Sequence, residues 1–160
     1  MDYGGKFLIK VASSGLSLDE LLFEINRVNK DKNSVVQVFD PRRVINQMHL
    51  AGAYMDTVES FKERTNISKT RGMEMLLFAA MTNQINEAIK IVGAKSSNDF
   101  VLFANNRATF NKAKRFLKSS KELARSRKAE REIATKFGIY TREDLDKFIL
   151  QKMAVSRLSD

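Results

Sequence analysis

Two short apolar runs near the N-terminus have the composition of β-strands. Lys6–Ala12 sets two lysines within an apolar run that ends at Ser-Ser-Gly, and Ser34–Phe39 is rich in valine. Both runs are bounded by turn-forming residues, as strands usually are. Between them, Ser17 is followed three residues later by Glu20 within an amphipathic pattern, which predicts a capped helix. A third strand is predicted at Asp99–Ala104.

Apolar residues recur at helical spacing along much of the remaining chain. Asp40 and Pro41 predict an N-cap and a first helical residue. The apolar residues that follow recur at steps of four and three, which predicts a long helix ending near Arg64. These apolar residues are Val44, Met48, Ala51, Met55 and Val58. Two shorter helices are predicted at about residues 70–81 and 84–92.

The C-terminal third is also predicted to be helical. Residues 108–136 are poor in apolar side chains but helical in pattern, with a break near Ser119-Ser120, and Thr141 is placed to cap a last helix. Strands alternate with helices along the chain, which indicates one α/β (α+β) domain over residues 1–160. We expect a small mixed sheet packed with several helices and a helical C-terminal half.

The charge of the chain is concentrated in one segment. The 160 residues carry a net charge of +9, and residues 107–131 hold ten basic residues against two acidic ones. A positive field of this density favours polyanionic partners. Five of these residues follow helical steps and predict one basic face on a continuous helix, widened by Arg115 and Arg127: Lys114, Lys118, Lys121, Arg125 and Lys128. The alternative is a solvated surface helix without a partner.

Composition argues against several classes of protein. The longest apolar run, from Met75 to Met81, is far too short to cross a membrane. Cysteine is absent, so we expect a cytoplasmic protein without disulfides or thiolate metal sites. His49, the sole histidine, lies two helical turns from Asp56 on the same side of the predicted helix and is either a general base or a packed structural residue. Because no phosphate-binding glycine loop, nucleophile pair or ligand cluster occurs, we expect no catalysis, cofactor, metal or small-molecule substrate, and a monomer when isolated.

Two further features are typical of binding surfaces. The polar elbow Thr82-Asn83-Gln84 separates two apolar helices. Its side chains either cap the second helix or, with that helix's first N–H groups, bind a phosphate or a nucleobase edge. The final helix carries two neighbouring apolar stripes, and one of them is either exposed to a partner or buried with the other. The stripes are Leu145, Phe148, Ile149 and Met153, and beside them Leu150, Ala154 and Leu158.

Motifs in the central and C-terminal parts resemble a known family. They occur, in order, at His49-Leu50, Asn66 with Ser68, Glu74 to Leu77, Asn83-Gln84-Ile85, Ala88-Ile89 and Gly93. A Phe-Gly-Ile at Phe137 and the final helix complete the pattern. Over roughly residues 45–104 and 136–158, the chain resembles the small regulatory subunit of the KEOPS (EKC) complex, the family that includes the PRPK-binding protein.

The resemblance implies a non-enzymatic accessory subunit. It implies docking on the complex's small kinase-like ATPase, and recruitment of tRNA through its single-stranded 3′ CCA end to the synthesis of threonylcarbamoyl adenosine. On this chain we expect the CCA end to bind at Lys62, Arg64, Asn66, Ser68, Lys69, Arg71, Asn83 and Gln84. We expect the basic face (Lys114, Arg115, Lys118, Lys121, Arg125 and Lys128) to contact the tRNA body. For the kinase subunit we expect Leu145, Phe148, Ile149, Lys152 and Met153.

The chain departs from the family pattern at two positions. Many members have a small residue where this chain has Met81, and arginine where it has Asn83. If that arginine binds a phosphate in those members, other groups such as Lys69 or Arg71 would bind it in this chain. Two alternatives stay open: a protein-only kinase regulator whose charge keeps it soluble, and an unrelated nucleic-acid-binding protein that uses only the basic face. Salt-insensitive kinase binding without RNA affinity would favour the first, and RNA binding indifferent to the CCA end the second.

Overall fold

A four-stranded sheet organises the fold. The computed structural model describes residues 7–123, 127–139 and 141–156. The strands are β1 (Leu8–Ser14), β2 (Val36–Phe39), β3 (Phe100–Ala104) and β4 (Leu117–Glu122). They are arranged in the order β2-β3-β1-β4, and each neighbouring pair is antiparallel. The α+β class is therefore confirmed, whereas the mixed sheet expected from the sequence is an antiparallel one.

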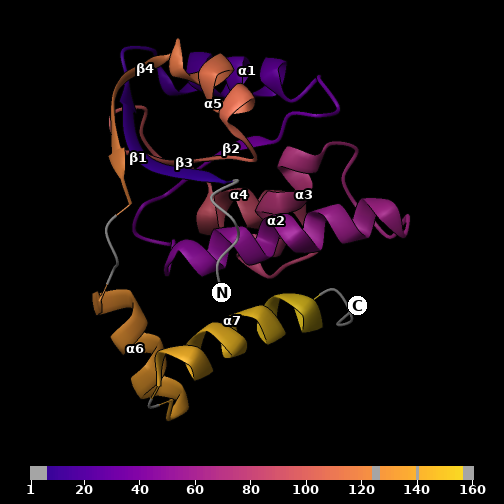
Figure 1. Ribbon diagram of the computed structural model, residues 1–160, viewed down its shortest axis with the longest axis vertical. Coiled ribbons are helices and arrows are strands. Elements are labelled where there is room, and N and C mark those ends of the chain that lie inside the picture. Colours follow the sequence, from indigo (N-terminus) through magenta and orange to yellow (C-terminus); the bar gives the residue numbers. More distant parts are fainter. Residues whose placement is uncertain (1–6, 124–126, 140, 157–160) are drawn as a thin grey trace.

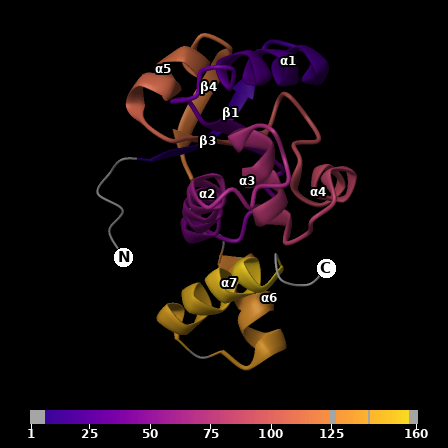
Figure 2. The same ribbon diagram turned by 90° about the vertical axis from the view of Figure 1, so that its right-hand side faces the viewer.

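Helices cover both faces of this sheet. They are α1 (Leu18–Val28), α2 (Gln47–Lys62), α3 (Arg71–Ala80), α4 (Ile85–Val92), α5 (Arg107–Lys114), α6 (Arg127–Phe137) and α7 (Arg142–Ser156). Helices α1 and α5 lie over one face, α2, α3 and α4 lie over the other, and α7 lies beyond α2 (Figures 1 and 2).

The core is divided in the same way because successive strand side chains point to opposite faces. The first cluster lies beneath α1 and α5 and includes Leu8, Leu21, Ile25, Phe100, Leu102 and Phe110. The second lies beneath α2, α3 and α4 and includes Ile9, Phe39, Leu50, Met75, Val101 and Phe103. Three residues of α7 (Leu145, Ile149 and Met153) belong to the second cluster, so the C-terminal helix completes this side of the core.

Three of the predicted helix starts are confirmed by their caps. The Ser17 side chain accepts a hydrogen bond from the Glu20 N–H at the start of α1. At the start of α3 the Thr70 hydroxyl accepts from the Met73 N–H, and before α7 the Thr141 hydroxyl accepts from the Asp144 N–H. In each case a short polar side chain satisfies an N–H group that has no partner within its helix.

The predicted start of the long helix at Asp40-Pro41 is wrong. The Asp40 carboxylate accepts from the backbone and guanidinium groups of Arg42, and the Asp40 carbonyl accepts from the Arg43 N–H. These contacts close a turn, and α2 begins only at Gln47, capped by Asn46. An acidic residue before a proline is favoured at the first position of a turn as well as at the N-cap of a helix, so the sequence alone does not distinguish the two.

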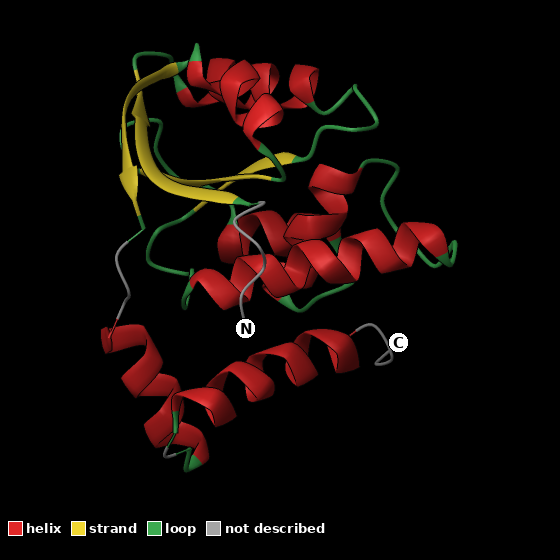
Figure 3. Cartoon of the chain, viewed as in Figure 1, coloured by secondary structure: helices red, strands yellow, loops and turns green. Residues whose placement is uncertain are grey.

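The continuous basic helix predicted within residues 107–131 is also wrong. The chain forms α5, then the edge strand β4, and then α6 (Figure 3). Strand β4 is nearly devoid of apolar side chains and forms because it pairs with β1 along its length. Two cross-strand contacts reinforce the pairing: the Ser13 and Ser119 hydroxyls lie 2.6 Å apart, and Lys10 forms an ion pair with Glu122.

Helix α7 packs closely along α2. The Asn46 side chain at the start of α2 donates to Asp146 over 3.1 Å. Further along, a Cβ atom at Gly52 would lie 2.3 Å from Leu150 Cδ2 and 2.8 Å from Met153 Cε. A glycine in the middle of a helix is unfavourable by roughly 1 kcal/mol relative to alanine. Here it leaves the space that these two α7 side chains occupy.

Candidate functional site

The residues expected at the tRNA 3′ end fall into two groups at opposite ends of α3. Lys62 to Arg71 form the connection from α2 into α3, and Asn83 and Gln84 follow the other end. Because α3 has ten residues and a helix rises 1.5 Å per residue, the two groups are about 15 Å apart along its axis. The fold therefore brings together the basic residues of the first group but separates them from the elbow.

A buried carboxylate shapes the connection between α2 and α3, which we call the 63–70 loop. Glu74 is fully buried, and its carboxylate accepts hydrogen bonds from the backbone N–H groups of Ile67 at 3.1 Å and Ser68 at 2.7 Å. The Asn66 side chain donates to the Ser68 carbonyl at 2.9 Å, and Ser68 is itself buried. Asn66 and Ser68 thus stabilise the conformation of the loop. Glu74 stabilises it as well, although sequence analysis identified Glu74 only as part of a motif.

Cations lie on this loop and at the ends of the two helices that it joins. Lys62, Arg64 and Lys69 are exposed to solvent. Arg71 is half-buried, donates from Nη1 to the Lys32 carbonyl at 2.9 Å, and lies 4.9 Å from the centre of the Phe61 ring. Arg71 therefore ties the start of α3 to the turn after α1. The three exposed cations are the groups available to an anionic ligand at this end of α3.

Backbone strain occurs where α2 and α3 end. Arg64 (φ 60°) and Met81 (φ 57°) have left-handed backbone conformations, which are unfavourable by roughly 1 kcal/mol for residues with a Cβ. Each closes a helix by the same hydrogen-bond pattern: Thr65 N–H donates to the Ser60 carbonyl, and Thr82 N–H to the Leu77 carbonyl. Glycine usually occupies such a position. Met81 therefore occupies a backbone conformation that glycine would adopt without strain.

The elbow before α4 differs from the capping arrangement expected. The N-cap of α4 is Gln84, whose side chain makes no capping hydrogen bond. The Thr82 hydroxyl instead accepts from the Gln84 N–H at 3.3 Å. At the far end of α4, the Lys95 ammonium donates to the carbonyls of Ile89 and Lys90, each at 2.8 Å, which favourably places a cation at the negative end of the helix dipole.

The residues expected to bind the kinase subunit divide between core and surface. Leu145, Ile149 and Met153 are buried against α2 and α3, so they anchor α7 and are not offered to a partner. Phe148 is half-buried and Lys152 is exposed, with the Lys152 ammonium 5.7 Å from the centre of the Phe148 ring. The second stripe is split as well, because Leu150 packs on α2, Ala154 is exposed and Leu158 lies outside the described residues.

The described residues of the expected basic face are exposed but lie on different elements. Lys114 ends α5, Arg115 follows it, Lys118 and Lys121 are on β4, and Lys128 is on α6. Arg125 lies outside the described residues. Because Lys118 and Lys121 are three residues apart on a strand, their side chains point to opposite faces of the sheet. The single basic face predicted from helical spacing therefore does not form.

His49 is a structural residue. It is buried, its Nε2–H donates to the Ala79 carbonyl at 2.8 Å, and its Nδ1 accepts from the Ile45 N–H at 3.2 Å. Burial lowers the pKa of His49, which outweighs the opposing effect of the Ala79 carbonyl. With both ring nitrogens engaged by backbone, the general-base interpretation loses its geometric basis.

Within residues 7–123, 127–139 and 141–156, no group of three or more His, Cys, Asp or Glu side chains is arranged to hold a metal ion. None of the helices in the described part of the chain has the length and apolar character of a membrane span.

Comparison with known proteins identifies one relationship. The family model described as kinase binding protein CGI-121 matches residues 17–157, which include every helix and the strands β2, β3 and β4. No curated protein matches the chain significantly. The matched range includes the 63–70 loop, the elbow and α7.

Proposed function

The chain belongs to the kinase binding protein CGI-121 family, and from this premise we propose that it is a non-catalytic accessory subunit of a KEOPS-type complex. It binds the small kinase-like ATPase of the complex and presents tRNA through the 3′ CCA end for threonylcarbamoyl adenosine synthesis. The family match is the observation that carries the proposal. The surfaces of α7 and of the 63–70 loop support it.

The kinase subunit docks on the outer stripe of α7, which consists of Phe148, Lys152 and Val155. These residues follow steps of four and three and so share one side of the helix. Lys152 and Val155 are exposed, with 53% of Val155 accessible to solvent, and Phe148 is half-buried. An aromatic ring, an aliphatic side chain and a cation in one row suit an interface with an apolar centre and a charged rim. Leu145, Ile149 and Met153 position this stripe by anchoring α7 from behind.

The 3′ end of tRNA binds at the 63–70 loop through its exposed cations. Lys62, Arg64 and Lys69 are separate donors on a backbone whose shape is set by the buried Glu74. Cations on a fixed loop neutralise phosphates, and this gives affinity that falls with salt. Asn83 and Gln84 are reached only if the single strand runs along α3, because they follow its other end. The tRNA body is contacted from separate elements by the exposed residues of the expected basic face: Lys114, Arg115, Lys118, Lys121 and Lys128.

A titration of the purified kinase-like ATPase tests the docking surface. The variant Lys152→Glu reverses one charge on the proposed stripe, and Lys147→Glu makes the same change about 140° around the helix. Both lysines are exposed, and the ion pair of Lys147 with Glu143 is at the surface, so its loss alters stability little. We expect Lys152→Glu to weaken binding at least tenfold and Lys147→Glu to leave it unchanged. Equal effects of the two variants would exclude the outer stripe of α7 as the docking surface.

A further inference from the structure

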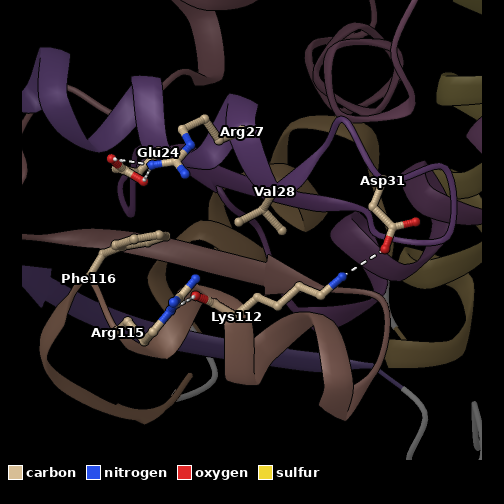
Figure 4. A pocket seen from close by; sticks show the side chains of 7 residues that line it. All are labelled: Glu24, Arg27, Val28, Asp31, Lys112, Arg115 and Phe116. Atoms are coloured by element: carbon tan, nitrogen blue, oxygen red, sulfur yellow. Dashed lines mark hydrogen bonds and ion pairs between the residues drawn. The ribbon is translucent and has the colours of Figure 1, made fainter.

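A hollow of about 170 Å³ is lined by residues of α1, of α5 and of the turns that follow them (Figure 4). Both helices lie on the opposite side of the sheet from α2 and α7 (Figure 1). Its apolar part consists of Val28 and the ring of Phe116. Its charged part consists of the cations Arg27, Lys112 and Arg115 and the acids Glu24 and Asp31. A flat apolar surface bordered by cations is suited to a ligand that combines a planar ring with a negative charge.

The cations of the hollow differ in how far they are already engaged. Lys112 Nζ lies 2.7 Å from the Asp31 carboxylate and 3.2 Å from the Ser34 hydroxyl. Arg27 lies 3.2 Å from the Glu24 carboxylate. Towards the part of the chain that the structure describes, Arg115 donates from Nε alone, to the Lys112 carbonyl at 3.5 Å, which uses one of its five N–H donors. Its guanidinium lies 6.0 Å from the centre of the Phe116 ring, so a large part of its hydrogen-bonding capacity stays available beside an aromatic surface.

A nucleotide fits this set of groups. Bases that leave a helical stack are held on aromatic rings and on guanidinium planes. Phosphates are held by arginine, which offers several donors in one plane. Carboxylates such as Glu24 and Asp31 accept hydrogen bonds from the amino groups of bases. The volume has room for one ring system, which favours a single nucleotide over an extended ligand.

The hollow adjoins the surface proposed for the 3′ end of tRNA. Asp31, at its rim, is followed by Lys32, whose carbonyl accepts from Arg71 at the start of α3. One turn earlier, the Asn29 side chain pairs with the backbone of Val36 and lies against Gly72. The turn after α1 therefore borders the hollow on one side and the 63–70 loop region on the other.

We propose that the hollow between α1 and α5 binds one unstacked nucleotide of the RNA whose 3′ end lies at the 63–70 loop, with the base on Phe116 and a phosphate at Arg115. This inference rests on the function proposed above. It adds a second contact with single-stranded RNA and assigns Arg115 to that strand in place of the tRNA body.

The test measures binding of the full chain to a fluorescent ten-nucleotide single-stranded RNA ending in CCA, by anisotropy at two salt concentrations. Phe116→Leu keeps an apolar side chain but removes the aromatic surface, and a loss of about 5- to 150-fold is expected for one stacked base. Phe116→Tyr keeps the ring and should bind as the wild type does. Arg115→Gln should weaken binding and reduce its salt dependence, whereas Arg107→Gln, at the far end of α5, is the matched control.

The outcomes separate this inference from the proposed function. If Phe116→Leu and Arg115→Gln bind as the wild type does while Lys69→Gln loses affinity, the hollow is excluded and the proposed 3′-end surface stands. If the wild type binds no RNA, both fail. A parallel titration with adenosine monophosphate distinguishes the source of the nucleotide. Tighter binding of the mononucleotide than of the RNA, lost in Phe116→Leu, would overturn the RNA assignment in favour of a free nucleotide.

Discussion

Replacing Glu74 by alanine should destabilise the fold strongly and release the 63–70 loop. The substitution removes the acceptor of the Ser68 N–H, which is buried, and of the Ile67 N–H, which is partly buried. Losing the partner of a buried donor costs about 1–3 kcal/mol, and a partly hydrated one costs about 1 kcal/mol. A carboxylate in the first turn of α3 contributes a further 0.3–1 kcal/mol or so through the helix dipole. The free energy of unfolding should therefore fall by about 2–5 kcal/mol.

Urea unfolding at pH 7 measures this loss. At a typical slope of roughly 1–3 kcal/mol per molar urea, the midpoint should fall by about 1–2 M. Glu74→Gln keeps one acceptor oxygen and should lose about half as much. Glu87→Gln, a change of the same kind on an exposed first-turn residue of α4, should shift stability by less than about 0.5 kcal/mol. If Glu74→Ala lost less than about 1 kcal/mol, or if the Ile67 and Ser68 amides exchanged as slowly as in the wild type, the role given to Glu74 would be refuted.

Three further substitutions test other parts of the fold. Arg64→Gly relieves a left-handed residue and should raise the free energy of unfolding by about 0.5–1 kcal/mol in urea titrations while weakening tRNA binding; lower stability would contradict the strain. Gly52→Leu should displace α7, lower stability by about 1–3 kcal/mol and weaken binding of the kinase-like ATPase; an unchanged unfolding midpoint would argue against the close packing. His49 is held neutral by burial, which lowers its folded-state pKa, so its contribution to stability is complete above the unfolded pKa of about 6.5 and is lost as the pH falls below it. The wild type should therefore be less stable at pH 5 than at pH 7.5 by a margin that shrinks in His49→Gln, and identical pH profiles would contradict this assignment.

Much of the first two-thirds of the fold followed from local pattern. The strands β1, β2 and β3 and the helices α1, α3 and α4 lie within a few residues of their predicted positions. Their apolar spacing, caps and turn residues all indicate the same structure, which is the condition for reliable sequence-based inference.

Strand β4 could not be predicted because its residues have no strand pattern of their own. Leu117 is its one apolar residue, and the others are lysine, serine and glutamate. The strand exists because β1 offers an unpaired edge, and tertiary pairing of this kind overrides the weak local preference. An edge strand that carries lysines also resists unwanted pairing with other chains, which gives Lys118 and Lys121 a structural reason for their positions.

The candidate sites were predictable as segments but not as surfaces. On α7, residue spacing predicted two apolar stripes but not which side chains are buried. The structure shows that Leu150 and Met153 pack on α2 in the space left by Gly52. The 63–70 loop and the elbow are close in sequence but separated by the length of α3. The hollow beside Phe116 joins α1 and α5, which are about 80 residues apart in the chain, so no local pattern could indicate it.

The most direct test of the whole account is binding of the purified chain to intact tRNA and to tRNA lacking its terminal CCA, at two salt concentrations. Exposed cations on a loop of fixed shape should bind the intact molecule with an affinity that falls as salt is raised. Removal of the CCA end should cause a large loss, because single-stranded bases provide the contacts that a duplex does not. Equal, salt-sensitive binding to both RNAs would contradict the account and leave a protein whose positive charge binds polyanions without regard to the tRNA end.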